Sequence, residues 1–206
     1  MKKLTFILFF TWFATMMAFG QGNLTAPQIL SKTVNLISTG KGIDAEFTVI
    51  NSGYSGKGTL KSSGEKFTIK MPDVEIWYNG KDMYTYNKRS GETTVITPTQ
   101  EELAESNPLA YVTGAQKNYN VVFSTVKKAG KYVLELTPTT KGGDIKRVTL
   151  TVKPANFAPE KLVVEPSSGS PITVEITTLK TGVACSSSDF EYPKSKYPKI
   201  EIIDLR

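Results

Sequence analysis

The side chains best suited to acid–base chemistry are those of Asp73 and Glu75, which lie two positions apart in a segment that alternates like a β-strand. Residues at this spacing share one face of a strand, so two carboxylates could act as general acid and base on a sugar substrate. The same spacing is typical of a solvated outer face. We expect a solvated face here and a protein that is not an enzyme.

The chain has no histidine and one cysteine, Cys185. These counts exclude histidine-based catalytic triads, histidine metal sites, cysteine-rich zinc sites and internal disulfides. Cys185 opens the polar stretch 185–188, and no histidine exists to activate it, so we expect an incidental free thiol. We therefore expect no catalytic residue, no metal and no cofactor.

The net charge is +6, from 25 Lys and Arg against 19 Asp and Glu. The basic residues are scattered in pairs such as Lys127-Lys128 and Lys146-Arg147, on segments that alternate like strands. Such pairs indicate solvated faces and not a stripe that follows nucleic-acid phosphates. We expect no nucleic-acid partner, while a weak attraction to an anionic membrane surface or an acidic partner fits this charge.

The first 20 residues are typical of a secretory signal peptide. Lys2 and Lys3 precede an apolar run from Leu4 to Phe19, and small residues precede a cleavage site between Gly20 and Gln21. The run is shorter than the roughly 20 residues that a membrane-spanning helix needs. No cysteine stands at the cleavage site for acylation, so we expect a soluble periplasmic protein whose residues 21–206 form a single domain.

The elements of this domain follow from periodicity. Pro27 and Gly40 bound an amphipathic helix with apolar residues at Ile29, Leu30, Val34 and Ile37. From Gly42 onward the period becomes two, and turn signals such as Asn79-Gly80 separate the segments. This rhythm predicts an antiparallel meander of eleven or twelve strands.

One helical insert interrupts the strands. Thr99 to Glu102 has the spacing of a capping box, and Pro108 follows a few residues later. Because a proline cannot continue a helix unperturbed, we expect two short helices or a kink. A sheet of so many strands must curl, and the helices either fill its apolar inner face or leave a pocket for an apolar ligand.

The order of these segments resembles the periplasmic lipoprotein carriers of the LolA family, especially the LolA-like proteins of the Bacteroidetes type. The family pattern of an acidic or amide residue, Gly, Lys, an aromatic and Tyr is filled by Asn79, Gly80, Lys81, Tyr84 and Tyr86. Further matches are Gly58-Thr59-Leu60, the Phe67 strand that ends at Pro72, Asn107-Pro108-Leu109, Phe190-Glu191-Tyr192-Pro193 and Ile200-Glu201-Ile202-Ile203-Asp204-Leu205.

This resemblance implies a mainly β (α+β) fold with a few helices: a curled, incompletely closed antiparallel β-barrel of about 11 strands, covered by the helices. It implies an apolar cavity that takes lipoprotein acyl chains released from the inner membrane and delivers them to the outer membrane. One position departs from the family. Proteobacterial carriers have an Arg-Pro pair linked to lid closure where this chain has Met71-Pro72, so control of a lid by that arginine is not implied.

Alternation along the strands predicts which residues line such a cavity, although apolar residues on one face of a curled sheet are also the default core. Trp77 and Tyr78 are expected at the rim. The predicted lining from the strands is Phe47, Val49, Leu60, Phe67, Ile69, Ile76, Tyr84, Tyr86, Leu134, Leu136, Leu150, Val152, Val164, Val174 and Ile176, with Leu103, Leu109 and Val112 from the helical insert.

The expected partners of a carrier are acylated lipoproteins, the inner-membrane machinery that releases them, and an outer-membrane acceptor or the membrane surface. We expect a monomer. Two alternatives use the same fold: a module that senses lipids or lipoproteins, and a surface or assembly module whose inner face is filled and binds no lipid.

Overall fold

The computed structural model describes residues 24–38, 41–140 and 142–206. The predicted signal peptide lies outside the described residues, as does Gly40, the predicted helix stop. Twelve strands form one sheet in the order β12-β6-β5-β4-β3-β2-β1-β11-β10-β9-β8-β7. The strands are β1 (Gly42–Asn51), β2 (Tyr54–Ser63), β3 (Lys66–Lys70), β4 (Val74–Tyr78), β5 (Met83–Asn87), β6 (Glu92–Ile96), β7 (Tyr119–Phe123), β8 (Tyr132–Pro138), β9 (Ile145–Val152), β10 (Pro159–Pro166), β11 (Ile172–Val183) and β12 (Ile202–Asp204).

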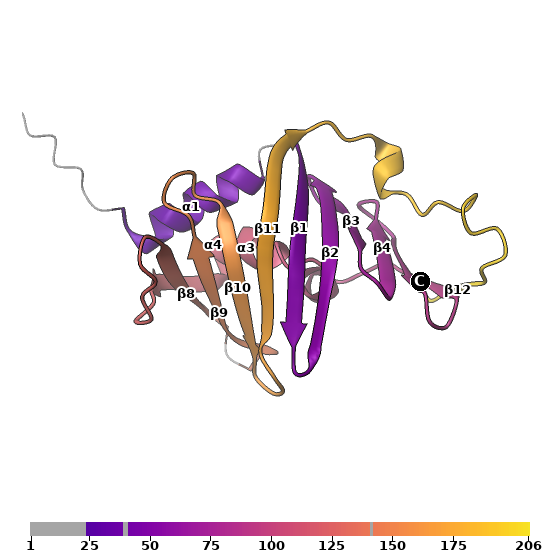
Figure 1. Ribbon diagram of the computed structural model, residues 1–206. Coiled ribbons are helices and arrows are strands. Elements are labelled where there is room, and N and C mark those ends of the chain that lie inside the picture. Colours follow the sequence, from indigo (N-terminus) through magenta and orange to yellow (C-terminus); the bar gives the residue numbers. More distant parts are fainter. Residues whose placement is uncertain (1–23, 39–40, 141) are drawn as a thin grey trace, which may run out of the picture.

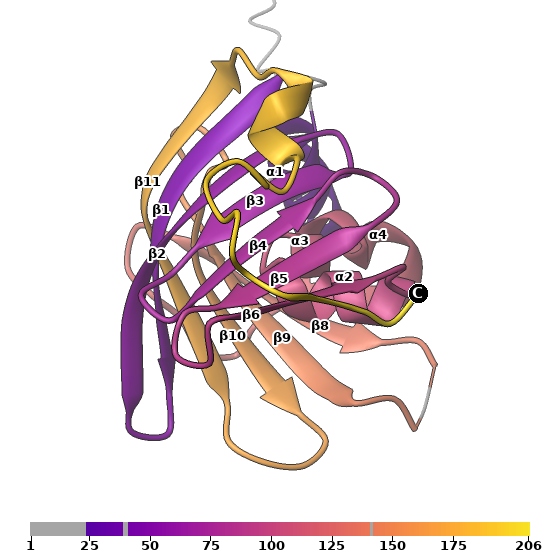
Figure 2. The same cartoon turned by 90° about the vertical axis from the view of Figure 1, so that its right-hand side faces the viewer.

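The sheet is curled and not closed (Figure 2). Every neighbouring pair is antiparallel except β12 and β6, which run parallel, and the edges are β12 and β7. The pairing of β1 with β11 joins the first half of the chain to the second half. The predicted fold class is therefore confirmed.

The helix α1 (Ala26–Ile37) begins as the sequence predicts, with a proline in its first turn. Thr25 and Gln28 form a capping box, in which the Gln28 side chain accepts a hydrogen bond of 2.9 Å from the Thr25 N–H. Its apolar stripe packs against the concave face of the sheet, where α1 contacts β7 and β8 (Figure 1). The buried residues of this stripe are Ile29, Leu30, Val34 and Ile37.

The helical insert between β6 and β7 consists of α2 (Gln100–Ser106), α3 (Ala110–Thr113) and α4 (Ala115–Asn118). Thr99 caps α2 through the predicted box, since Glu102 accepts a 2.7 Å hydrogen bond from the Thr99 N–H. The chain breaks around Pro108 as expected. A third short helix, α4, follows where the sequence predicted two pieces or a kink.

Strand pairing defines the two faces of the sheet, because residues directly opposite each other on neighbouring strands share a face. Leu60, Ile69 and Ile76 are in register across β2, β3 and β4, on the concave face that the helices cover. Trp77 pairs with Tyr84 on the opposite, outer face. That outer face is covered by the C-terminal segment from 184 to 201, which passes in front of β3 to β6 before β12 joins the sheet (Figure 2).

Candidate functional site

A pocket of about 350 Å³ lies on the helix-covered side of the sheet. It lies where the last turn of α1, the ends of β1 to β3 and the helices α2 and α3 meet. Its lining residues are Ile37, Ser38, Ile43, Ser62, Gly64, Glu65, Phe67, Gln100, Leu103, Asn107, Leu109, Ala110 and Thr113. Its volume is at the lower end of the range for small-molecule sites.

The apolar wall of the pocket is assembled from three parts of the chain. Ile43 and Phe67 come from the concave face of the sheet, and Ile37 comes from the last turn of α1. Leu103 on α2 and Leu109 before α3 form the opposite side. Leu103 is half-buried while the other four are buried, so α2 is the least firmly packed wall of the pocket.

The polar part of the lining contains a single charged group, Glu65, together with amides and hydroxyls such as Gln100, Asn107 and Thr113. Asn107 has a structural role, because its Oδ1 accepts a 3.0 Å hydrogen bond from the Leu109 N–H and so fixes the turn that directs the chain from α2 into α3. A lining that combines apolar side chains with a few polar groups is typical of small-molecule sites.

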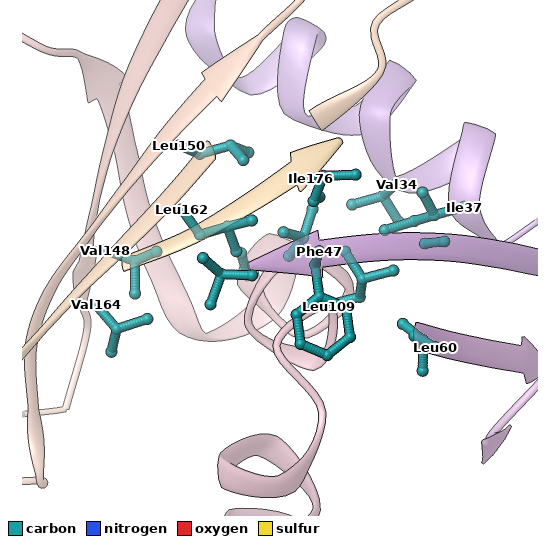
Figure 3. Packing of buried hydrophobic residues seen from close by; sticks show 14 of the residues in the cluster. Val34, Ile37, Phe47, Leu60, Leu109, Val148, Leu150, Leu162, Val164 and Ile176 are labelled. Atoms are coloured by element: carbon teal, nitrogen blue, oxygen red, sulfur yellow. The ribbon is translucent and has the colours of Figure 1, made fainter. Parts of the chain in front are cut away.

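Three of the predicted lining residues, Phe67, Leu103 and Leu109, border this pocket. Others lie on the same concave side but belong to the packed core: Phe47, Leu60, Ile69, Val112, Leu134, Leu136, Leu150, Val152, Val164, Val174 and Ile176 are buried, while Val49 and Ile76 pack against that core and are half-buried. Figure 3 shows Val34 and Ile37 of α1 with Phe47, Leu150, Leu162 and Ile176 in this core. Most of the concave face is thus already filled by side chains of the protein.

The expectation that Tyr84 and Tyr86 face the cavity is wrong. Tyr84 pairs with Trp77 and Tyr86 pairs with Glu75, so both rings lie on the outer face. There Tyr84 stacks on Tyr192 with ring centroids 5.2 Å apart, and the ring centroids of Tyr86 and Tyr197 are 4.7 Å apart. Tyr84 and Tyr86 do share one face of β5, as the alternation predicts. That face is the outer one, where the C-terminal segment forms a second apolar layer against these rings.

Trp77 and Tyr78 are both buried and not at a rim. Trp77 lies under Tyr192 on the outer face, with ring centroids 5.3 Å apart. Tyr78 lies on the concave face, 5.5 Å from the ring of Phe67, and its burial raises the pKa of the Tyr78 hydroxyl above its usual value.

The expectation that Asp73 and Glu75 form a solvated pair is also wrong for Glu75. This carboxylate lies on the outer face but is only 7% exposed, because the C-terminal segment covers it. It forms an ion pair of 3.1 Å with Lys88 and accepts a hydrogen bond of 3.3 Å from the Tyr197 hydroxyl. Asp73 pairs with Arg89 at 2.9 Å. Both carboxylates are engaged by cations, as structural groups are.

Several pocket residues were missed by the sequence reasoning. Ile43 shares the alternation of Phe47 and Val49 and could have been found from that pattern. Ile37 was recognised as an apolar helix position, but nothing local indicated that the end of α1 would meet Leu109. Gln100 and Asn107 carry no such signal, since only the packing of the insert brings their polar groups to the pocket.

Within the described parts of the chain, no helix is long and apolar enough to cross a membrane. In the same parts, no group of three or more His, Cys, Asp or Glu side chains is placed to hold a metal ion. Cys185 is half-buried beside the end of β11.

Comparison with known proteins gives a family match over most of the chain. A family model described as outer membrane lipoprotein carrier protein LolA matches residues 16–166. No curated protein matches the sequence.

Two solved structures are similar to this chain over most of its length. An uncharacterized conserved protein from Thermus thermophilus is similar with a TM-score of 0.58 at 10% identity, over 87% of this chain and 98% of that chain. A LolA superfamily protein from Nitrosomonas europaea is similar with a TM-score of 0.42 at 14% identity, over 82% of this chain and 98% of that one.

Proposed function

The chain belongs to the LolA family of outer membrane lipoprotein carrier proteins, and we propose that it shields lipoprotein acyl chains and delivers lipoproteins to the outer membrane. Proteins of this family are periplasmic and generally non-enzymatic, and the family implies lipoprotein cargo. We propose that residues 21–206 act there as a single domain and as a monomer, after removal of the signal peptide. Release machinery in the inner membrane would load the chain, and an acceptor or the outer membrane itself would unload it.

The observation that carries this proposal is the apolar pocket between the sheet and the helical insert. Ile43, Phe67 and Leu109 supply the hydrocarbon surface. The apolar side that α2 contributes, through Leu103, is more exposed than the others. Each methylene left in water costs about 0.8 kcal/mol, so an acyl chain gains stability by entering such a site. The chemistry needs shape and apolar surface, and it needs no nucleophile, base or metal.

The pocket is too small for several acyl chains, so loading requires the insert to move away from the sheet. The buried apolar residues of this insert are Leu109, Val112 and Ala115. Exposing one leucine and one valine costs roughly 3 to 6 kcal/mol, at about 1.5 to 3 kcal/mol for each side chain. Burying about four to eight methylene groups offsets this cost. One long acyl chain carries more methylene groups than that.

Control of this opening is expected to differ from that of carriers with the Arg-Pro pair. The backbone carbonyl of Met71 accepts a 2.8 Å hydrogen bond from the Lys88 Nζ, and the Met71 side chain packs against the core. Met71 carries no charge that could bind the helical insert. We propose that apolar packing of Leu109 and Val112 alone holds the insert closed.

The test is native mass spectrometry of the protein purified without detergent from the periplasm of a host that makes lipoproteins. One-to-one complexes with acylated proteins or diacyl lipids would support the carrier. A bare protein mass that persists after purified lipoprotein is added would contradict it. That result would favour the filled-core module, for which the packed concave face around Leu150 is the relevant observation.

The residues of the site are tested by Leu103→Asp. Leu103 is half-buried, so the protein should still fold, whereas a carboxylate at Leu136, which is fully buried, would disrupt the core. We expect Leu103→Asp to reduce cargo capture at least tenfold, because the charge must be desolvated against the acyl chain. The matched control is Ile50→Asp, at an exposed apolar residue on the outer face of β1. Equal capture by Leu103→Asp and the wild type would show that this pocket is not the binding site.

A further inference from the structure

Exposed apolar side chains gather where β7 ends and its loop to β8 begins. Val122, Phe123 and Val126 are 54%, 49% and 70% exposed. Single exposed apolar residues are ordinary on protein surfaces, but Phe123 and Val126 line one hollow. Val122 pairs with Glu135 and faces the other side of the sheet. β7 is an edge of the sheet, and β8 beside it lies at the opposite end of the molecule from β12 (Figure 1).

The same loop is basic. Lys127, Lys128 and Lys131 follow the apolar residues, and the segment 119–131 contains no Asp or Glu. Loop and strand together enclose a second hollow of about 340 Å³, lined by Phe123, Ser124, Val126, Lys127, Lys128, Ala129, Lys131, Tyr132 and Val133. Lysine side chains and apolar side chains therefore line the same hollow.

One carboxylate balances part of this charge. Glu160 at the start of β10 forms ion pairs with Lys128, at 2.8 Å, and with Lys131. Hydrogen bonds from these two lysines lower the pKa of Glu160 to about 2, so it remains ionised at neutral pH. Three lysines less one carboxylate leave a local charge of +2.

The loop holds its apolar tip in a fixed conformation. The Ser124 N–H donates a 2.9 Å hydrogen bond to the Val133 carbonyl, and the Val126 N–H donates a 3.1 Å bond to the Ser124 hydroxyl. A turn from Lys128 to Lys131 closes the loop, with Gly130 at φ 65° in the left-handed region that favours glycine. These bonds keep Val126 outward and prevent the loop from folding back to bury it.

We propose that the β7–β8 loop docks the protein on an anionic phospholipid bilayer, with Phe123 and Val126 in the interfacial region and the lysines among the headgroups. Apolar side chains flanked by lysines are what binding to an anionic membrane surface requires, because apolar burial and charge attraction act together. Lysine stems can lie along the apolar region while their ammonium groups stay at the phosphates. A peptide that paired with the β7 edge would use the strand backbone and leave Val126 and Lys127 unexplained.

This inference goes beyond the carrier proposal and does not depend on it. The loop is separate from the pocket, since the two linings share no residue. Docking can therefore be measured on cargo-free protein. Cargo capture is measured separately, so a failure of either proposal can be distinguished from a failure of the other.

The experiment is flotation of residues 21–206, made in the cytosol without the signal peptide and so free of lipoprotein cargo, with vesicles of phosphatidylcholine alone or mixed with phosphatidylglycerol. We expect binding to the mixed vesicles, weakened by high salt. Each lysine near an anionic surface contributes about fivefold to binding, so Lys127→Glu should weaken it by that factor or more. Val126→Asp should weaken it about tenfold or more, because it removes apolar burial and adds repulsion.

Two controls are matched to these variants. Ile50→Asp adds the same charge at an exposed apolar residue of β1, and Lys57→Glu reverses an exposed lysine on β2. Both should bind vesicles as the wild type does, and circular dichroism melting should show that all four variants are folded. Equal binding to both kinds of vesicle, or unchanged binding of Val126→Asp and Lys127→Glu, would overturn the proposal. A loss of vesicle binding with Val122→Pro while Val126→Asp still binds would overturn the assignment of docking to the loop tip.

Discussion

At the scale of single residues, Gly58 on β2 and Phe47 on β1 make a close contact within the sheet. The two residues pair across the strands, and a Cβ built on Gly58 would lie 2.6 Å from Cζ of the Phe47 ring. Phe47 is buried in the core, so its ring cannot swing out of the way. The glycine therefore allows a large aromatic side chain to lie flat on the concave face.

We predict that Gly58→Ala destabilises the protein by about 1 to 3 kcal/mol, the usual cost of forcing extra volume into a packed core. Gly143→Ala is the control, because a Cβ there meets nothing within 4 Å and its backbone is not left-handed. The measurement is urea unfolding of both variants. Equal midpoints for the two variants would show that Phe47 can move aside.

The ion pairs of Glu160 make stability depend on pH in a defined window. The pKa of this carboxyl falls from 4.5 to about 2 in the folded protein, chiefly through the hydrogen bond from Lys128 and then that from Lys131. A lowered carboxyl pKa stabilises the fold above the unfolded value, and this contribution is lost as the pH falls from about 4.5 to about 2. The groups are near the surface, so we expect about 1 kcal/mol in total.

Melting of Glu160→Gln against the wild type measures this contribution. At pH 7 the variant should melt about 2 to 4 °C lower, and the difference should vanish as the pH falls to about 2. Glu92→Gln, at an exposed carboxylate on β6, should show no such pH-dependent difference. A difference that is constant from pH 7 to pH 2 would mean that packing, and not charge, is responsible.

At the scale of elements, the C-terminal segment acts as a second layer on the outer face of β3 to β6. Tyr192 is its anchor: it is 6% exposed, stacks on Tyr84 and lies edge-on to Trp77. Its hydroxyl shares a 3.1 Å hydrogen bond with the buried hydroxyl of Thr93. A further bond of 2.6 Å runs from the Thr68 hydroxyl to the Asp189 carbonyl. This layer explains why aromatic residues occupy the outer face of β4 and β5.

We predict that Tyr192→Ala destabilises the protein by about 3 to 5 kcal/mol, as the loss of a buried aromatic ring does. Tyr192→Phe should cost about 1 to 3 kcal/mol, because it leaves the Thr93 hydroxyl buried without its partner. Tyr54→Ala removes an exposed ring and serves as the control. If Tyr192→Ala unfolds at the same denaturant concentration as Tyr54→Ala, the segment is not an integral layer.

At the scale of the whole molecule, the sheet connects distant parts of the chain. β1 pairs with β2 on one side and with β11 on the other, so the first strand of the chain is a hydrogen-bonded neighbour of a strand from its last third. The α1 helix and the insert then pack on one continuous concave face. The two halves of the sheet cannot separate without breaking the β1–β11 pairing.

We therefore predict one cooperative unfolding transition. Trp77 fluorescence reports the outer layer near β4, whereas far-ultraviolet circular dichroism reports the whole sheet. In urea the two signals should give the same midpoint within error. Two separated transitions would contradict the proposal that residues 21–206 form a single domain.

Local patterns in the sequence were sufficient for the elements of this fold. Pro27 lies in the first turn of α1 and Thr99 caps α2 as predicted, and the two-residue alternation recovers the strands and their number. These signals are local, because a cap or a pleat depends on residues that are neighbours in the chain. The same alternation found the concave face for Phe47, Leu60 and Ile69. The signal peptide remains a prediction.

Only the tertiary structure decided which face of β4 and β5 the helices cover, which face the C-terminal segment covers, and where the pocket lies. Alternation groups residues by face but does not say what covers each face, so Tyr84 and Tyr86 were assigned to the wrong side. The reason is the C-terminal segment, more than 100 residues away along the chain, which packs on them. The pocket likewise needs Ile37 and Leu109 to meet. Such meetings depend on packing between distant segments, and no local pattern encodes them.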